Sequence, residues 1–352
     1  MSIQSEKVIN ASGELNVTCI WNEAEHSAFT DLIRFKERWL VCFREADNHA
    51  CGRDGIVRII VSNDGNRWET AATFELDGFD LRDPHFSLTP DGRLMLSCAG
   101  RVFRDGQFQT LQSFCAFSAD GYQWSALQET GPREHWFWRV VWVDGAAYSW
   151  VREQNLHGVS GPQPFRLFRS HDGIEWEMIA ETLHGNEASI VSSRDGVMRV
   201  WLRGWNSLIG ESRFPYTEWA WHKTGYFAGG PHWIELSDGR IIAGARLFRQ
   251  PATAEGYRDP FMLLYEFEKD TKTLRPILEL PSGSDCTYPG LVEHEGELWV
   301  SYYSGHEGKK SIYLARVPLA ALDGDLSQTY PPYFAPGEVA DLALHSASPT
   351  QS

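Results

Sequence analysis

Arginines, carboxylates, histidines and a tyrosine recur in this chain beside short apolar segments. One set follows such segments: Arg44, Arg101, Arg152, Arg203, Arg246 and His306. A second set precedes such segments: Asp31, Asp83 with His85, Arg139, Glu187, His232 and Tyr288. Arginine binds anions through paired hydrogen bonds, and carboxylates and tyrosine can carry acid–base and nucleophilic chemistry. These residue types predict a site for an anionic substrate, provided that the fold brings them together.

The apolar segments are joined by turns that favour β-hairpins. Turns of the Asp-Gly type occur at Asp91-Gly92, Asp144-Gly145, Asp195-Gly196, Asp238-Gly239 and Glu295-Gly296. An earlier turn at Lys36-Glu37 lacks the glycine. Asp-Gly between alternating apolar segments is a strong hairpin signal. The sequence therefore predicts one such hairpin in roughly every 50 residues.

A second repeated motif, S-x-D-G-x-x-W, lies between the hairpins. Its copies are Ser62–Trp68, Ser118–Trp124 and Ser170–Trp176, with a degenerate copy at Glu268–Leu274. The aspartate can accept backbone hydrogen bonds, the glycine can adopt a positive φ, and the tryptophan can cover the turn. Two hairpins per repeat predict an all-β protein, a six-bladed β-propeller with four-stranded antiparallel blades. A seventh blade stays open as an alternative, because residues 1–25 could add strands.

The propeller fold predicts where the polar residues meet. The innermost strand of each blade runs from one face to the other, and the second strand returns. The start of the first strand and the end of the second therefore share a face, so we expect both polar sets to converge there. We assign residues 1–330 to a single propeller domain and residues 331–352 to a closing segment and a loose C-terminal tail.

The composition excludes several classes of protein. The chain has 352 residues and a formal net charge of −15, which argues against nucleic-acid binding. Its hydrophobic content of 42% is too high for a disordered chain, and no apolar run is long enough for a membrane span. The sequence starts without a signal-peptide pattern and contains no CxxC, so we expect reduced thiols and a cytoplasmic location. The absence of H-x-H, HExxH and Gly-rich phosphate-loop patterns predicts neither a metal nor a cofactor.

The repeated S-x-D-G-x-x-W motif is the Asp box, and over residues 28–318 the chain resembles the sialidase (neuraminidase) superfamily of β-propellers. Asn186-Glu187, followed by the segments that end at Arg203, resembles the family's glutamate and an arginine of its carboxylate-binding triad. The resemblance implies that Tyr288 is the nucleophile. It also implies that Glu187 accepts the proton of this tyrosine.

Further family elements bear on the general acid. Arg44 resembles the arginine that follows the first strand pair of sialidases, and the family's general-acid aspartate lies in the loop after it, where Asp47 and Asp54 both stay open. Arg82-Asp83-Pro84 resembles an element of furanosidases and mannoside phosphorylases whose aspartate contacts the sugar ring. The second copy, Arg258-Asp259-Pro260, is interpreted as structural.

The chain departs from the sialidase pattern at its start. Phe29-Thr30-Asp31-Leu32 stands where the family has Phe/Tyr-Arg-Ile-Pro, so the first arginine of the triad is absent. Either Arg246 or Arg258 would be the third. This departure argues against sialidase activity in the strict sense.

We therefore expect a glycoside hydrolase that removes a terminal residue from a small acidic or modified oligosaccharide. The expected acid/base is one of Asp83, Asp31 and Asp54. The expected substrate-binding residues are Arg44, Arg82, His85, Arg139, Arg203, His232, Arg246 and His306. Two alternatives stay open: a lyase acting on a uronate through Tyr288 and His85 or His232, and a non-catalytic sugar-binding propeller. The oligomeric state is left open.

Overall fold

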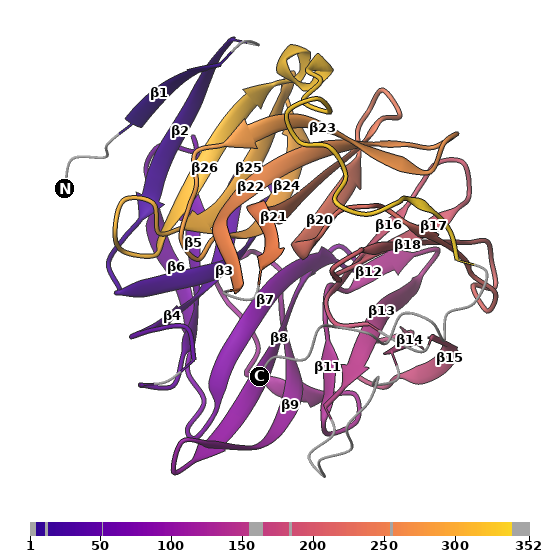
Figure 1. Cartoon of the computed structure of the whole chain (residues 1–352). Coiled ribbons are helices and arrows are strands. Elements are labelled where there is room, and N and C mark those ends of the chain that lie inside the picture. Colours follow the sequence, from indigo (N-terminus) through magenta and orange to yellow (C-terminus); the bar gives the residue numbers. More distant parts are fainter. Residues whose placement is uncertain are drawn as a thin grey trace.

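Six antiparallel sheets surround a common centre (Figure 1). The computed structural model describes residues 5–10, 13–50, 52–154, 165–182, 185–253 and 256–339. The chain is an all-β, six-bladed β-propeller, as predicted, in which three blades have four strands and three contain a fifth. Among the described residues, no helix has the length and hydropathy required to cross a lipid bilayer.

The first three blades follow one another along the chain. Blade 1 contains β3 (His26–Phe35), β4 (Arg38–Ala46), β5 (Ile56–Ser62) and β6 (Glu69–Phe74). Blade 2 contains β7 (Asp80–Leu88), β8 (Leu94–Arg104), β9 (Gln107–Ser118) and β10 (Gln128–Thr130). Blade 3 contains β11 (His135–Phe137), β12 (Val141–Val143), β13 (Ala146–Glu153), β14 (Phe165–Ser170) and β15 (Glu177–Thr182). Its innermost position is shared by β11 and β12, which both pair with β13.

The last three blades complete the ring. Blade 4 contains β16 (Ala188–Ser192), β17 (Met198–Leu202), β18 (Leu208–Ser212) and β19 (Ala220–Lys223). Blade 5 contains β20 (Gly229–Glu235), β21 (Ile241–Thr253), β22 (Gly256–Glu268) and β23 (Thr273–Leu280). Blade 6 contains β24 (Thr287–His294), β25 (Glu297–Ser304), β26 (Ser311–Pro318), β2 (Gly13–Trp21) and β1 (Ser5–Asn10). A short 3₁₀ helix, η1 (Leu319–Asp323), follows β26.

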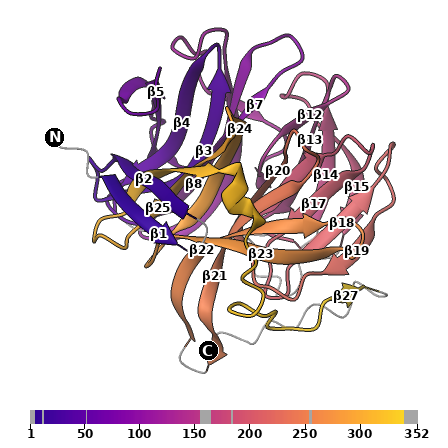
Figure 2. The ribbon, with the colours of Figure 1, turned by 90° about the horizontal axis from the view of Figure 1, so that it is seen from above.

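The chain start closes the ring. Strand β2 pairs with β26, so the sixth blade combines the two ends of the propeller sequence. Figure 2 shows β1 and β2, in indigo, beside the strands of this last blade. The alternative of a seventh blade is therefore wrong, because the early strands extend blade 6.

The C-terminal segment, expected as a closing segment and a loose tail, contributes one short strand. This strand, β27 (Gly337–Glu338), pairs with β19 on the outside of blade 4. The tail from residue 340 onward lies outside the described residues.

The predicted turns join the predicted strands. Lys36 and Glu37 have φ of 48° and 62°, so this turn adopts the left-handed backbone of a tight hairpin without glycine. The Asp boxes join the third and fourth strands of blades 1 to 3. In the first box, Asp64 Oδ1 accepts hydrogen bonds from the backbone N–H of Asn66 at 2.8 Å and of Arg67 at 3.1 Å. These local hydrogen bonds stabilise the turns between the outer strands.

Tryptophans pack between blades. Trp39 of blade 1 stacks on Trp299 of blade 6 with ring centroids 3.9 Å apart. Gly65 of the first Asp box lies against the same Trp299 ring, where a Cβ atom would come within 2.3 Å. The described cysteines are free thiols, and Cys51 lies outside the described residues.

Candidate active site

Four innermost strands carry a β-bulge near the same end. The registers shift between Ala28 and Asp31, Arg82 and His85, Gly229 and His232, and Thr287 and Gly290. Each bulge contains one residue in the left-handed region: Phe29 (φ 61°), Asp83 (φ 47°), Gly230 (φ 57°) and Tyr288 (φ 50°). A bulge re-aims side chains and occurs often beside active sites. This repeated distortion presents Asp83 and Tyr288 to the centre of the ring.

The structure brings Tyr288 and Glu187 into contact. The Tyr288 hydroxyl donates a hydrogen bond to Glu187 Oε1, which also pairs with Arg203. Glu187 Oε2 accepts the backbone N–H of Gly230 at 2.7 Å. Burial would raise the pKa of Glu187, but the charge of Arg203 and the hydrogen bond from Tyr288 hold it below its usual value. Glu187 is therefore ionised and positioned to accept the tyrosine proton.

Gly230 leaves room for the tyrosine ring. A Cβ atom at this position would come within 2.6 Å of the Tyr288 ring. Its positive φ also suits glycine better than any other residue. The glycine therefore supports the position of Tyr288 and supplies a hydrogen bond to Glu187.

Asp83 is a buried carboxyl group beside this pair, with 5% of its surface exposed. Burial and the negative charge of Glu187 raise the pKa of Asp83 to about 7, although Arg82, Arg44 and Arg203 act in the opposite direction. A carboxylic acid with such a pKa can both donate and accept a proton near neutrality. Of the three expected acid/base residues, Asp83 has the environment that suits the role.

Asp80 holds two of the expected arginines. Its Oδ1 accepts bonds from Arg44 Nε at 2.9 Å and Nη2 at 2.7 Å, and its Oδ2 accepts one from Arg82 Nε at 2.7 Å. The backbone N–H of Gly55 donates to the same carboxylate at 2.8 Å. Arg44 and Arg82 thus lie together, fixed by an aspartate that the sequence analysis did not single out.

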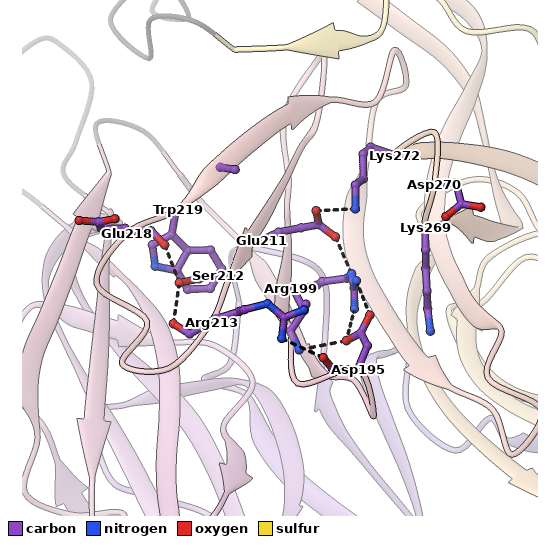
Figure 3. Close-up of a pocket in the computed structure, with 12 residues that line it drawn as sticks. Asp195, Arg199, Glu211, Ser212, Arg213, Glu218, Trp219, Lys269, Asp270 and Lys272 are labelled. Atoms are coloured by element: carbon purple, nitrogen blue, oxygen red, sulfur yellow. Dashed lines mark hydrogen bonds and ion pairs between the residues drawn. The ribbon is translucent and has the colours of Figure 1, made fainter.

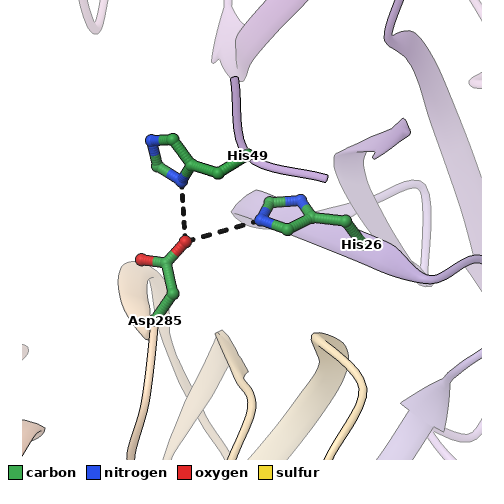
Figure 4. A group of neighbouring side chains, drawn as sticks. All are labelled: His26, His49 and Asp285. Carbon is green, nitrogen blue, oxygen red and sulfur yellow. Dashed lines mark hydrogen bonds and ion pairs between the residues drawn. The ribbon is translucent and has the colours of Figure 1, made fainter. Parts of the chain in front are cut away.

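Asp285 organises a second group of side chains, which adjoins the first because Arg82 Nη2 donates to the His49 carbonyl at 2.6 Å (Figure 4). His49 Nδ1 lies 2.7 Å and His26 Nε2 lies 3.4 Å from its Oδ2. Its Oδ1 accepts bonds from the Tyr303 hydroxyl at 2.8 Å and from Arg246 Nη1 at 3.1 Å. Burial would raise the pKa of Asp285, but the hydrogen bonds from both histidines and the charge of Arg246 hold it well below its usual range.

The same three side chains could ligate a metal ion, since one atom from each of His26, His49 and Asp285 lies within 4.8 Å of the others. The three residues lie far apart in the sequence, so they match no short metal-ligand motif. The carboxylate oxygens, however, already accept four hydrogen bonds, and one donor is the cation of Arg246. A divalent ion would have to displace these bonds, so the group fits the positioning of Arg246 better than it fits a metal.

Four expected residues form a deeper layer. Asp31 and the histidines lie two residues beyond the bulge residues of their strands. Asp31 Oδ1 pairs with Arg139 Nη1 at 2.7 Å, and Arg139 Nη2 donates to the Pro289 carbonyl at 2.6 Å. His232 Nδ1 lies 3.0 Å from that carbonyl, and His85 Nδ1 lies 3.8 Å from Asp31.

This layer has its own electrostatics. Burial raises the pKa of Asp31, against the effect of Arg139. Burial and the charge of Arg139 lower the pKa of both His85 and His232 well below the usual value, so these rings are neutral. Asp31 is engaged by an arginine and by the backbone N–H of Phe86 at 2.9 Å. The layer forms a floor for the site.

The remaining expected residues lie further out. Asp54 is exposed beside Gly55, and burial and the charge of Asp80 raise its pKa. His306 Nδ1 lies 2.8 Å from Ser304 Oγ, and the His306 ring contacts Tyr313 at a centroid distance of 4.7 Å. The side chain of Arg258 lies outside the described residues.

A separate cavity of about 800 Å³ lies at the other end of the β16–β17 hairpin (Figure 3). In it, Arg199 pairs with Asp195 and with Glu211, each at 2.7 Å. Lys272 adds a further pair with Glu211 at 2.7 Å. None of the expected site residues lines this cavity.

Comparison with known proteins gives similarity at the level of structure. No family model and no curated protein matches the chain. A protein of unknown function from Dyadobacter fermentans matches over 89% of this chain and 99% of its own, with a TM-score of 0.73 and 19% identity.

Two glycoside hydrolases also share the fold. Trypanosoma rangeli sialidase matches over 91% of this chain with a TM-score of 0.67 and 11% identity. This chain spans 58% of the length of that sialidase. An α-L-arabinofuranosidase from Fusarium graminearum matches over 90% of this chain and 98% of its own, with a TM-score of 0.66 and 11% identity. The expected resemblance to sialidase propellers is confirmed for the fold.

Proposed function

We propose that this protein is a glycoside hydrolase that acts on a terminal residue of an anionic oligosaccharide through a tyrosine nucleophile. The observation that carries the proposal is the hydrogen bond from Tyr288 to Glu187, across 101 residues of sequence. The sialidase and arabinofuranosidase with the same fold support the reaction class.

The reaction proceeds in two displacements. The Tyr288 oxygen attacks the anomeric carbon while its proton passes to Glu187. Asp83 protonates the glycosidic oxygen, whose bond to the anomeric carbon breaks, and the first sugar product leaves. A water molecule then attacks the anomeric carbon and gives a proton to Asp83. The bond between that carbon and the Tyr288 oxygen breaks, and this oxygen regains its proton from Glu187. Two inversions give net retention of configuration.

The charges at the pair explain why a tyrosine suits an anionic sugar. Burial and the charge of Glu187 raise the pKa of Tyr288 well above its usual value, so the hydroxyl is neutral in the resting site. A neutral nucleophile approaches an anionic sugar without the repulsion that a carboxylate would meet. Its negative charge develops only as Glu187 takes the proton.

The proposal is tested by screening purified protein against acidic and neutral glycosides, with Tyr288→Phe beside the wild type. We expect the wild type to release reducing sugar and the variant to lose turnover by about 10³-fold. Tyr313→Phe is a matched control, because the Tyr313 hydroxyl also bonds a glutamate, Glu307, at 2.6 Å, but lies outside the central group.

Three outcomes would contradict the hydrolase mechanism. Full activity in Tyr288→Phe would exclude the tyrosine nucleophile. A product that absorbs as an unsaturated uronate would indicate a lyase. Sugar binding without turnover across the panel would favour a binding propeller.

A further inference from the structure

Most arginines at the centre of the propeller are already neutralised by a carboxylate. The pairs are Arg44 with Asp80, Arg82 with Asp80, Arg139 with Asp31, Arg203 with Glu187 and Arg246 with Asp285. An arginine in such a pair has less charge and fewer donors to offer a ligand. The arginines that lack a carboxylate partner are therefore better indicators of where a substrate anion binds.

Arg101 is one of the unpaired arginines. It lies directly opposite Asp80 in the β7–β8 register, but Asp80 is occupied by Arg44 and Arg82. Its guanidinium instead packs over the rings of Phe103 and Phe108, at 4.7 and 4.9 Å.

The unpaired state of Arg101 is visible at the atomic level. Among the described residues, its Nε is a buried donor without a hydrogen-bond partner. Burial and the neighbouring charge of Arg82 lower the pKa of Arg101 to about 10, which an incoming anion would reverse. Because the residue is only half-buried, a ligand can reach it.

Arg152 is the second unpaired arginine. Its two hydrogen bonds go to neutral amide oxygens, those of Asn186 at 2.8 Å and Gln154 at 2.6 Å. In the part of the chain that the structure describes, it forms no ion pair. The following residues 155–164 contain neither aspartate nor glutamate. Burial lowers the pKa of Arg152, against the raising effect of Glu187.

The geometry brings both arginines towards the proposed acid/base. Arg101 lies opposite Asp80, on the strand that carries Asp83, and Arg152 bonds the neighbour of Glu187, Asn186. Charge interactions join each of them to Asp83, and join Arg101 to Arg152. Two arginines that form no ion pair within the described residues, beside one proton donor, make a site for an oxyanion, since guanidinium groups match carboxylate and sulfate geometry.

We propose that Arg101 and Arg152 bind the anionic group of the substrate, a carboxylate or sulfate carried by a sugar. This inference rests on the proposed function, because it names the charged group of that substrate. It assigns anion recognition to blades 2 and 3, beside Asp83. The paired Arg203 and Arg246 then support the nucleophile side.

The test is calorimetric titration with D-glucuronate, D-glucose 6-sulfate and neutral D-glucose. We expect the wild type to bind at least one charged sugar about tenfold or more tightly than glucose. Arg101→Gln and Arg152→Gln should each lower that affinity about tenfold and leave glucose binding unchanged. Arg104→Gln, an exposed arginine of the same strand as Arg101, is the control. The charged sugar that binds more tightly identifies the group.

The inference is overturned if neither charged sugar is preferred over glucose, or if the glutamine variants bind like wild type. Should a glutamine variant fail to fold, the lysine variant replaces it. Weakened binding by the lysine variant then supports the inference, and unchanged binding overturns it.

Turnover of the glycoside panel, measured with the same protein preparations, distinguishes the proposed hydrolase activity from the proposed anion site. Arginine-dependent binding by a protein without turnover overturns the proposed function alone. Turnover without any preference for a charged sugar overturns the anion site alone.

Discussion

At each end of the β16–β17 hairpin an arginine pairs with a glutamate, but the electrostatic surroundings of the two pairs differ. At one end Glu187 pairs with Arg203, and at the other Glu211 pairs with Arg199. The Arg199 end lines a cavity of about 800 Å³, where cations and carboxylates balance locally. The Arg203 end faces the centre, where Asp83 has a pKa of about 7 and arginines outnumber their partners.

This difference shows that cavity size is a poor guide to chemistry in this fold. In the cavity, hydrogen bonds from Arg199 are the main cause that lowers the pKa of Asp195 to about 2, so this carboxylate stays ionised. In the centre, Asp83 can change protonation state at neutral pH. A perturbed acid beside unpaired cations marks a functional site more specifically than a cavity does.

The largest expected effect is a difference in turnover between variants of Glu187 and Glu211. Glu187→Gln should lower turnover by about 10³-fold, because the glutamine cannot accept the Tyr288 proton. Glu211→Gln removes the matching ion pair in the cavity and should leave turnover within about twofold. Steady-state kinetics on both variants tests the comparison, and equal losses would refute it.

The second expected effect concerns Asp83. Asp83→Asn should lower turnover by about 10²-fold or more, and the fall in wild-type activity above about pH 7 should disappear from its profile. The raised pKa of Asp83 also makes the free energy of unfolding depend on pH, because the folded state binds this proton more tightly than the unfolded state. Stability is therefore lost as pH rises from about 4 through 7.

Asp83→Asn should consequently stabilise the fold at pH 8 by on the order of a few kcal/mol, and by less at pH 5. Thermal unfolding at both pH values measures this difference. A variant that is inactive and destabilised at pH 8 would indicate that Asp83 is structural.

A smaller effect is expected at Gly230. Gly230→Ala combines backbone strain of about 1–2 kcal/mol with displacement of the Tyr288 ring, and turnover should fall about tenfold. Gly92→Ala is the matched control, since its φ is 79° and no atom lies within 4 Å of the added Cβ. The control should lose stability but keep its activity. Equal activity in the two variants would show that the Tyr288 position is not critical.

The smallest effect is expected in the cavity. Asp195→Asn should cost on the order of 1 kcal/mol of stability at pH 7, because a partly exposed pair is screened by solvent. The lowered pKa means that this contribution is complete above about pH 4 and is lost as pH falls through about 2. Urea unfolding at pH 7 and pH 2.5 checks both, and turnover at pH 7 should not change.

Local signals explain why the fold was predictable. The hairpin turns and Asp boxes each specify a strand boundary within a few residues, and their repetition predicts the number of blades. The faces of the strands then predicted that Tyr288, Glu187 and Asp83 would meet. The seventh-blade alternative arose because no local sequence signal indicates that β2 pairs with β26.

The site partners were harder to predict because they depend on long-range geometry. Asp80 and Asp285 carry no motif, and their roles come from arginines on other strands or blades. The bulges were invisible in the sequence, so the depth of Asp31 and His85 relative to Asp83 was not predicted. A shift of two positions along a strand separates His85, in the floor of the site, from Asp83, the proposed acid/base.

The pairing of β2 with β26 also fixes an order of events in folding. Val17 pairs with Ala315, so β2 must wait for its partner until nearly the whole propeller has been synthesised. The intervening blades contain mostly local hairpins and can form earlier, whereas this final contact closes a very long loop. Until then β26 has an unpaired edge, which is a site for pairing between chains. Assembly of this ring therefore has a late, concentration-sensitive step at the junction of its two ends.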